Sequence, residues 1–173
     1  FRSHIKDVDY GTIKILVSRG VSARGYALPD QDADIYMYFY PSTLQSQPIL
    51  IDKIGILDEP LGEMMPRLKG VKTLNRLEQV MLKHAAQKKH WIEALCLDNQ
   101  QNVVEAISSN CFIYLNEQWI TPDLATTGIA GTMRAEILSR MADYQISHQV
   151  RMITVSELAQ AEALFLCNAL QPM

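Results

Sequence analysis

The sequence lacks the features that commonly direct a protein to nucleic acid or to a membrane. Its 173 residues include 16 basic and 19 acidic residues, giving a net charge of −3, and contain no block of basic residues. Nucleic acid is therefore not an expected partner. No apolar run is long enough to span a bilayer, and no charged-then-apolar leader resembles a signal peptide. We expect a protein of the cytoplasm that acts away from membranes.

Cysteine is scarce as well. The three cysteines, Cys96, Cys111 and Cys167, are odd in number and widely spaced, and each lies in an apolar run. Their spacing does not match that of zinc ligands, so we predict no metal site. We interpret them as small core residues of a protein in a reducing compartment.

The composition is that of a folded domain. Hydrophobic residues make up 48% of the chain and charged residues 20%, which provides a packed core and argues against disorder. The length suits one domain or slightly more. Because the chain starts at Phe1 instead of Met and ends just after an apolar run, we expect it to be part of a longer protein.

Strand-like and helix-like segments are mixed along the chain. We expect a helical tail over 1–10, and helices from about 74 to 90, from 133 to about 142, and over 154–161. β-Branched and aromatic runs predict strands at 12–18, 34–40, 49–57, 94–97, 103–107, 111–115, 118–121, 149–153 and 163–167. The order lacks strict strand–helix–strand alternation, which favours an α+β fold, or an irregular α/β fold, over a Rossmann sheet.

A lysine lies just before the first of these helices. Gly70 allows a turn into the helix, and Thr73 or Asn75 is expected to cap its first N–H groups. Lys72 thus lies in an irregular segment that the helix fixes in place. Most lysines in such positions are simply solvated, so this one matters because of the residues that accompany it. The apolar stripe expected to anchor the helix consists of Leu74, Leu77, Met81 and Ala85.

A glutamate interrupts an apolar strand. Glu105 lies in the segment 103–107, which has apolar neighbours on both faces. A carboxylate there is costly unless it has a partner. Two interpretations are open: a charge on an edge strand, or a carboxylate that faces a buried cation such as a protonated ring nitrogen.

A glycine-bearing loop, 128–132, precedes the second helix. Free N–H groups and the dipole at a helix start form an anion site, and Gly131 allows close backbone approach there. Many such loops are ordinary turns. Asn168, at the end of the last strand, either adds a side-chain donor to the same anion or is a turn asparagine.

Taken together, a lysine, a buried carboxylate and a phosphate-sized anion site match the needs of pyridoxal phosphate. The lysine binds the aldehyde covalently, and the carboxylate keeps the pyridine nitrogen protonated. The helix start holds the phosphate.

Five segments resemble those of the fold-type IV pyridoxal-phosphate family. That family includes branched-chain and D-amino-acid aminotransferases and the aminodeoxychorismate lyases, and the lysine segment most resembles the lyases. The five segments occur in the family's order and span nearly the whole chain. They are 18–26 (the loop that meets the substrate carboxylate), 70–80 (lysine), 104–112 (glutamate), 128–134 (phosphate loop) and 167–170 (last cofactor segment).

The resemblance implies a fold and a role for each residue. It places 1–173 mainly in the C-terminal, cofactor-binding large domain, with mixed strands around a central barrel-like sheet and flanking helices. The family's small N-terminal domain and final strands have no match. The implied roles are catalysis and proton transfer for Lys72, pairing with the ring nitrogen for Glu105, phosphate binding for Gly131, Thr132, Met133 and Asn168, and substrate binding for Arg24, Tyr26 and Arg76.

The resemblance also implies a reaction. A lyase of this kind converts aminodeoxychorismate to p-aminobenzoate and pyruvate, a step of folate biosynthesis. Two alternatives stay open: an aminotransferase for D-amino acids or branched-chain amino acids, and a non-catalytic homologue that binds phosphate ligands or merely dimerises. Because fold-type IV enzymes are usually dimers, we expect a homodimer.

Overall fold

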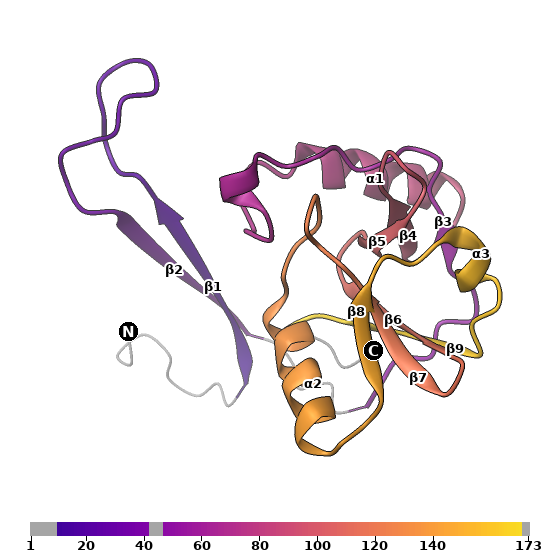
Figure 1. Ribbon diagram of the computed structural model, residues 1–173. Helices are drawn as coiled ribbons and strands as arrows, with labels where there is room; N and C mark the ends of the chain where they lie inside the picture. Colours follow the sequence, from indigo (N-terminus) through magenta and orange to yellow (C-terminus); the bar gives the residue numbers. More distant parts are fainter. Residues whose placement is uncertain (1–9, 42–46, 171–173) are drawn as a thin grey trace. The chain divides into compact units, whose positions relative to one another are not determined.

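The structure of the chain is a computed structural model that describes residues 10–41 and 47–170 (Figure 1). The chain divides into two compact units, Phe1–Ser46 and Gln47–Met173, and each is described by itself. The helical tail expected over 1–10 lies almost wholly outside the described residues. The assignment of 1–173 mainly to one large cofactor-binding domain stays a prediction.

The described part of the first unit, 10–41, is a long antiparallel hairpin. Strand β1 (Gly11–Ser18) pairs with β2 (Asp34–Pro41), with Ile15 opposite Met37. This register confirms both predicted strands. It also gathers the β-branched and other apolar residues of alternate positions on one face, because successive side chains of a strand point to opposite faces. That face consists of Ile13, Ile15, Val17, Ile35, Met37 and Phe39.

The second unit contains two sheets. The three-stranded sheet has the order β3-β4-β5, with β3 parallel to β4 and β4 antiparallel to β5. The four-stranded sheet has the order β8-β7-β6-β9. The strands of the two sheets are β3 (Gly55–Ile56), β4 (Ala94–Leu97), β5 (Val103–Ala106), β6 (Asn110–Leu115), β7 (Gln118–Pro122), β8 (His148–Arg151) and β9 (Ala163–Cys167).

Three α-helices and a short 3-10 turn complete the unit: α1 (Leu77–Lys88), α2 (Thr132–Asp143), α3 (Val155–Leu158) and η2 (Pro66–Leu68). The capping residues predicted for α3 are confirmed. The Thr154 hydroxyl accepts the Glu157 N–H at 3.2 Å, and the Glu157 carboxylate accepts the Thr154 N–H at 3.0 Å. This reciprocal pair satisfies two N–H groups at the helix start.

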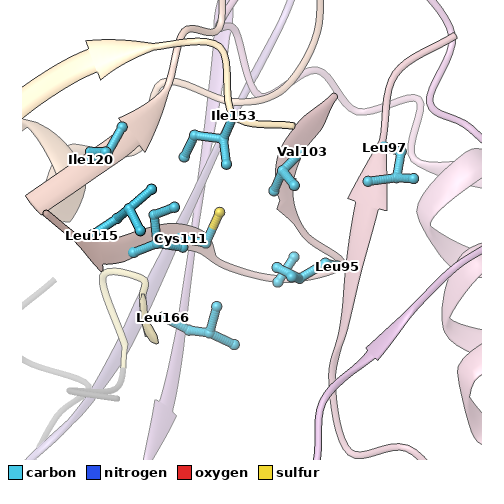
Figure 2. Close-up of a cluster of buried hydrophobic side chains, with 10 residues drawn as sticks. Leu95, Leu97, Val103, Cys111, Leu115, Ile120, Ile153 and Leu166 are labelled. Carbon is cyan, nitrogen blue, oxygen red and sulfur yellow. The ribbon is translucent and has the colours of Figure 1, made fainter. Parts of the chain in front are cut away.

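The two sheets share one hydrophobic core, and each packs a helix on its other face. Figure 2 shows side chains of the shared core, among them Leu95 of β4 and Leu115 of β6, directed into the same space. A second cluster joins α1 to β4 and β5, and a third joins α2 to β6 and β9. Figure 1 shows α2, in orange, along the four-stranded sheet. The α+β prediction is confirmed, and within 47–170 the strands form two open sheets, not a closed barrel.

The strand predicted over 49–57 is mostly wrong. Strand β3 includes only Gly55 and Ile56 of this range, and just after it the Leu57 N–H donates to the Leu95 carbonyl of β4 at 2.9 Å. Among the described residues, no strand pairs with 49–54, and Leu50 is 90% exposed. An alternating sequence pattern does not form a strand without a partner for its backbone groups.

The stripe predicted for the first helix is wrong except at Ala85, which packs against the cluster that joins α1 to β4 and β5. The predicted cap is wrong as well. The helix begins at Leu77 after Arg76, without a side-chain cap. Leu77 is 66% exposed and Met81 53% exposed, while Leu82 and Ala86 are 1% and 0% exposed. The buried pair faces β4 and β5. Apolar residues occur on two faces of this helix, so their spacing alone does not tell which face the sheet covers.

This corrected orientation predicts unequal effects of two neighbouring substitutions. Leu82→Ala is expected to lower the free energy of unfolding by about 2–5 kcal/mol, because it leaves a cavity in the cluster under α1. The matched control, Met81→Ala, removes an exposed side chain and is expected to change it by less than about 1 kcal/mol. Urea unfolding of both variants measures the difference, and equal losses would contradict the orientation.

Candidate active site

Seven of the nine predicted site residues line one pocket of the second unit. The pocket has a volume of about 710 Å³, within the usual range for small-molecule sites. The structure therefore brings together residues from four distant segments of the sequence. The seven are Lys72, Arg76, Glu105, Gly131, Thr132, Met133 and Asn168.

The lysine segment is held against the glycine-bearing loop. The Ala130 N–H donates to the Gly70 carbonyl at 3.0 Å, and Gly70 forms a parallel bridge with Ile129. Gly70 has a φ of +74°, a left-handed conformation that favours glycine. Two residues further on, Lys72 is exposed and lines the pocket. The backbone pairing thus fixes the lysine beside the loop that precedes α2.

Glu105 is a buried carboxylate at the edge of a sheet. Although β5 is an outer strand, Glu105 is only 4% exposed, so it is not a solvated edge charge. Its carboxylate accepts the Ile129 N–H at 2.8 Å. Burial raises the pKa of Glu105 to about 7, opposed by the Ile129 hydrogen bond and by the charges of Arg76 and Lys72. Burial and the nearby charges of Arg76 and Lys72 favour a carboxylate that faces a cation over a charge on an edge strand.

The start of α2 forms another part of the pocket. Gly131 precedes the helix, and no side chain caps the first N–H groups, which leaves them to bind an anion. A Cβ on Gly131 would overlap Asn110 Oδ1, so a larger residue here requires the Asn110 side chain or the loop to move. Asn110 also donates to the Ile129 carbonyl at 2.8 Å. No sequence pattern marked Asn110, which lies at the start of a buried strand.

Asn168 organises one end of the pocket. Its amide nitrogen donates to Ser109 Oγ at 3.2 Å and to the Ser108 carbonyl at 3.4 Å, and its oxygen accepts the Leu170 N–H at 2.8 Å. Ser108 and Ser109 line the same pocket and were not selected from the sequence. Direct phosphate binding by Asn168 stays a prediction.

The three predicted substrate residues lie in different parts of the chain. Arg76 immediately precedes α1, is partly buried and lines the pocket. Arg24 and Tyr26 belong to the loop between β1 and β2 in the first unit, where Tyr26 is 96% exposed and its carbonyl accepts from Arg19 at 3.5 Å. Their roles in substrate binding stay predictions.

The cysteines are confirmed as core residues. All three thiols are free and buried. Burial raises the pKa of Cys111 to about 12 and the pKa of Cys167 to about 11, so these groups stay protonated near neutral pH. Within residues 10–41 and 47–170, no group of three His, Cys, Asp or Glu side chains is placed to hold a metal ion. No helix in those ranges has the length and apolar character to cross a membrane.

Comparison with known proteins identifies the family. The family described as amino-transferase class IV matches residues 2–173. The chain belongs to the class IV aminotransferase family. The match covers both compact units and all nine predicted site residues, and it supports the fold-type IV assignment.

Two lyases are similar to this chain. Aminodeoxychorismate lyase from Vibrio harveyi is 31% identical over 169 residues, which cover 96% of this chain and 62% of that protein. The crystal structure of 4-amino-4-deoxychorismate lyase from Pseudomonas aeruginosa is 34% identical, with a TM-score of 0.77, over 91% of this chain and 59% of that one. The chain thus spans about three-fifths of the length of these relatives.

The same fold occurs in more distant aminotransferases. The crystal structure of the branched-chain aminotransferase from the archaeon Thermoproteus uzoniensis, with norvaline, has a TM-score of 0.77. It is 19% identical and covers 93% of this chain and 55% of that one. At this identity the likeness shows the fold alone.

Proposed function

We propose that the protein containing this chain is a pyridoxal-phosphate-dependent lyase that converts aminodeoxychorismate to p-aminobenzoate and pyruvate, a step of folate biosynthesis. The observation that carries the proposal is the shared pocket of Lys72, buried Glu105 and the uncapped start of α2. Two lyases, which are 31% and 34% identical to this chain over the aligned residues, support this substrate.

The residues of the pocket fit the cofactor. Lys72 supplies an amine for the aldehyde. Glu105, with a pKa of about 7, gains from a positive ring nitrogen beside it. At the start of α2, which no side chain caps, the N–H groups of Thr132 and Met133 would bind the phosphate.

When bound, the cofactor supplies an electron sink for the bonds at the amine-bearing carbon. The Lys72 amine removes the proton from that carbon and returns a proton to the carbon of the departing pyruvate fragment. The Glu105 carboxylate keeps the ring nitrogen in its protonated state. By resemblance, Arg24 and Tyr26 would bind the substrate carboxylates, for which a guanidinium provides paired N–H donors, and Arg76 would also contact the substrate.

A product assay on the whole protein tests this proposal against the aminotransferase alternative. The lyase releases pyruvate and p-aminobenzoate from aminodeoxychorismate without an added keto acid. Activity that requires a keto acid acceptor would favour the D-amino-acid or branched-chain aminotransferase. A protein that binds no pyridoxal phosphate would favour a non-catalytic homologue.

On the ground of the family resemblance, we also propose that the protein is a homodimer. On the ground of its sequence, we propose that it works in the cytoplasm. Its only proposed partners are a second copy and a small-molecule substrate.

The tight contact at Gly131 predicts an effect on cofactor binding. Gly131→Ala is expected to weaken pyridoxal phosphate binding about tenfold, a change of ~1.4 kcal/mol, because a Cβ would displace Asn110 or the loop and move the N–H donors of Thr132 and Met133. The matched control is Gly62→Ala, whose Cβ would meet Glu78 at an ordinary 3.5 Å. Absorbance titration measures both, and unchanged affinity in Gly131→Ala would contradict the anion-site assignment.

A further inference from the structure

A second buried glutamate lies just behind the pocket. Glu93, immediately before β4, is 4% exposed, and it is not among the residues that line the pocket. In the part of the chain that the structure describes, no lysine, arginine or histidine forms an ion pair with it. A buried carboxylate without a cation must be stabilised by hydrogen bonds.

Four donors supply those bonds. One carboxylate oxygen accepts the N–H groups of Ala94 and Ile107, each at 3.1 Å. The other accepts the Ser108 N–H at 3.3 Å and the Ser108 hydroxyl. Three of the four donors thus belong to Ile107 and Ser108, fourteen and fifteen residues away in sequence. The carboxylate therefore ties the start of β4 to the connection between β5 and β6.

That connection is a wall of the pocket. It is a tight turn in which the Ala106 N–H donates to the Ser109 carbonyl at 2.7 Å. Residues 105–110, from Glu105 through the turn to Asn110, all line the pocket. At the far end of the turn, Ser109 and the Ser108 carbonyl accept from the Asn168 amide. A shift of the turn would therefore move Ser109 and Asn168 together.

We propose that Glu93 is a positioning residue that holds the 107–109 turn, and through it Ser109 and Asn168, in the shape that receives the phosphate of the cofactor. The inference rests on the proposed function, because it assumes that pyridoxal phosphate occupies this pocket. Glu93 itself touches neither cofactor nor substrate. It acts by fixing the backbone of the wall.

The test compares two ligands that differ only in the phosphate. In the whole protein, Glu93→Gln keeps the size of the side chain but replaces one accepting oxygen by an NH₂ group. The donors of that oxygen then lose this acceptor, although the Ile107 N–H keeps a second one, the Ala94 carbonyl at 3.1 Å. We expect the variant to bind pyridoxal phosphate about tenfold more weakly, a change that corresponds to ~1.4 kcal/mol. Its affinity for pyridoxal, which lacks the phosphate, is expected to stay within about twofold of the wild-type value.

Each outcome is decisive. Loss confined to pyridoxal phosphate supports the positioning role. Unchanged affinity for pyridoxal phosphate would overturn it and show that Glu93 has no role in binding. Equal loss of affinity for both ligands would also overturn it and show a general stabilising role. If Glu93→Gln does not fold, Ser108→Ala removes one donor and leaves the three backbone donors, and the same two-ligand comparison applies to it. Wild-type protein that binds neither ligand at Lys72 would instead refute the proposed function.

Discussion

Replacing Lys72 by alanine is expected to abolish turnover, lowering pyruvate release by about 10⁴-fold or more. The lysine both holds the cofactor and moves the proton at the amine-bearing carbon, and proton transfer by a positioned side chain alone typically contributes about 10²–10⁴-fold. The fold should survive, because Lys72 is exposed and lies outside the helices and strands. A coupled pyruvate assay on the purified whole protein measures the loss.

Two matched variants separate the chemistry of Lys72 from its charge and its location. Lys72→Arg keeps the positive charge but cannot bind the aldehyde, so it should be as inactive as the alanine variant. Lys69→Ala removes an exposed lysine three residues earlier that does not line the pocket, and its activity should stay within about twofold of wild type. Substantial activity in Lys72→Ala would refute the assignment of the catalytic lysine.

Replacing Glu105 by glutamine is expected to reduce activity at least about 100-fold, the size typical of losing one electrostatic partner of a transition state. A neutral amide does not hold the ring nitrogen in its protonated form, so the electron sink weakens. Glutamine keeps the volume of the side chain, and its oxygen still accepts the Ile129 N–H. Activity close to wild type would show that this carboxylate does not face the ring nitrogen.

Although Glu105→Gln lowers activity, it is expected to stabilise the folded protein at high pH when the cofactor is absent. The folded-state pKa of Glu105 is about 7, above its ordinary 4.5, so between these values the folded protein binds a proton that the unfolded chain does not. The contribution of Glu105 to stability is therefore present below pH 4.5 and falls as pH rises through 7, by about 3 kcal/mol in total. Glu105→Gln removes this dependence.

Chemical unfolding at pH 5 and pH 8 measures this effect. The free energy of unfolding of the wild-type protein should fall more between these pH values than that of Glu105→Gln, and at pH 8 the variant should be the more stable of the two. Identical changes with pH in both proteins would contradict the raised pKa.

The site residues found from the sequence are those with a local signal. Lys72 precedes a helix, Glu105 interrupts an apolar strand, and Gly131 precedes another helix. Each of these patterns can be interpreted from residues only a few positions away in the sequence. The structure brings all three residues to one pocket. The family resemblance added the substrate residues, which no local pattern marks.

The residues that the sequence did not reveal act across long separations. Glu93 resembles an ordinary surface charge before a strand, because its donors at Ile107 and Ser108 are near it only in the fold. The role of Asn110 is visible only in its hydrogen bond to the Ile129 carbonyl, nineteen residues away. The predicted orientation of α1 is wrong for a related reason. The face of the helix that is buried depends on where β4 and β5 lie, and helical spacing does not encode that.

The central claim is that Lys72 binds pyridoxal phosphate covalently in this pocket. The most direct measurement is to add pyridoxal phosphate to the whole protein, reduce it with borohydride and map the modified peptide by mass spectrometry. The account predicts a single label on Lys72. No label, or a label on another lysine such as Lys69, would contradict the assignment of the site and the function built on it.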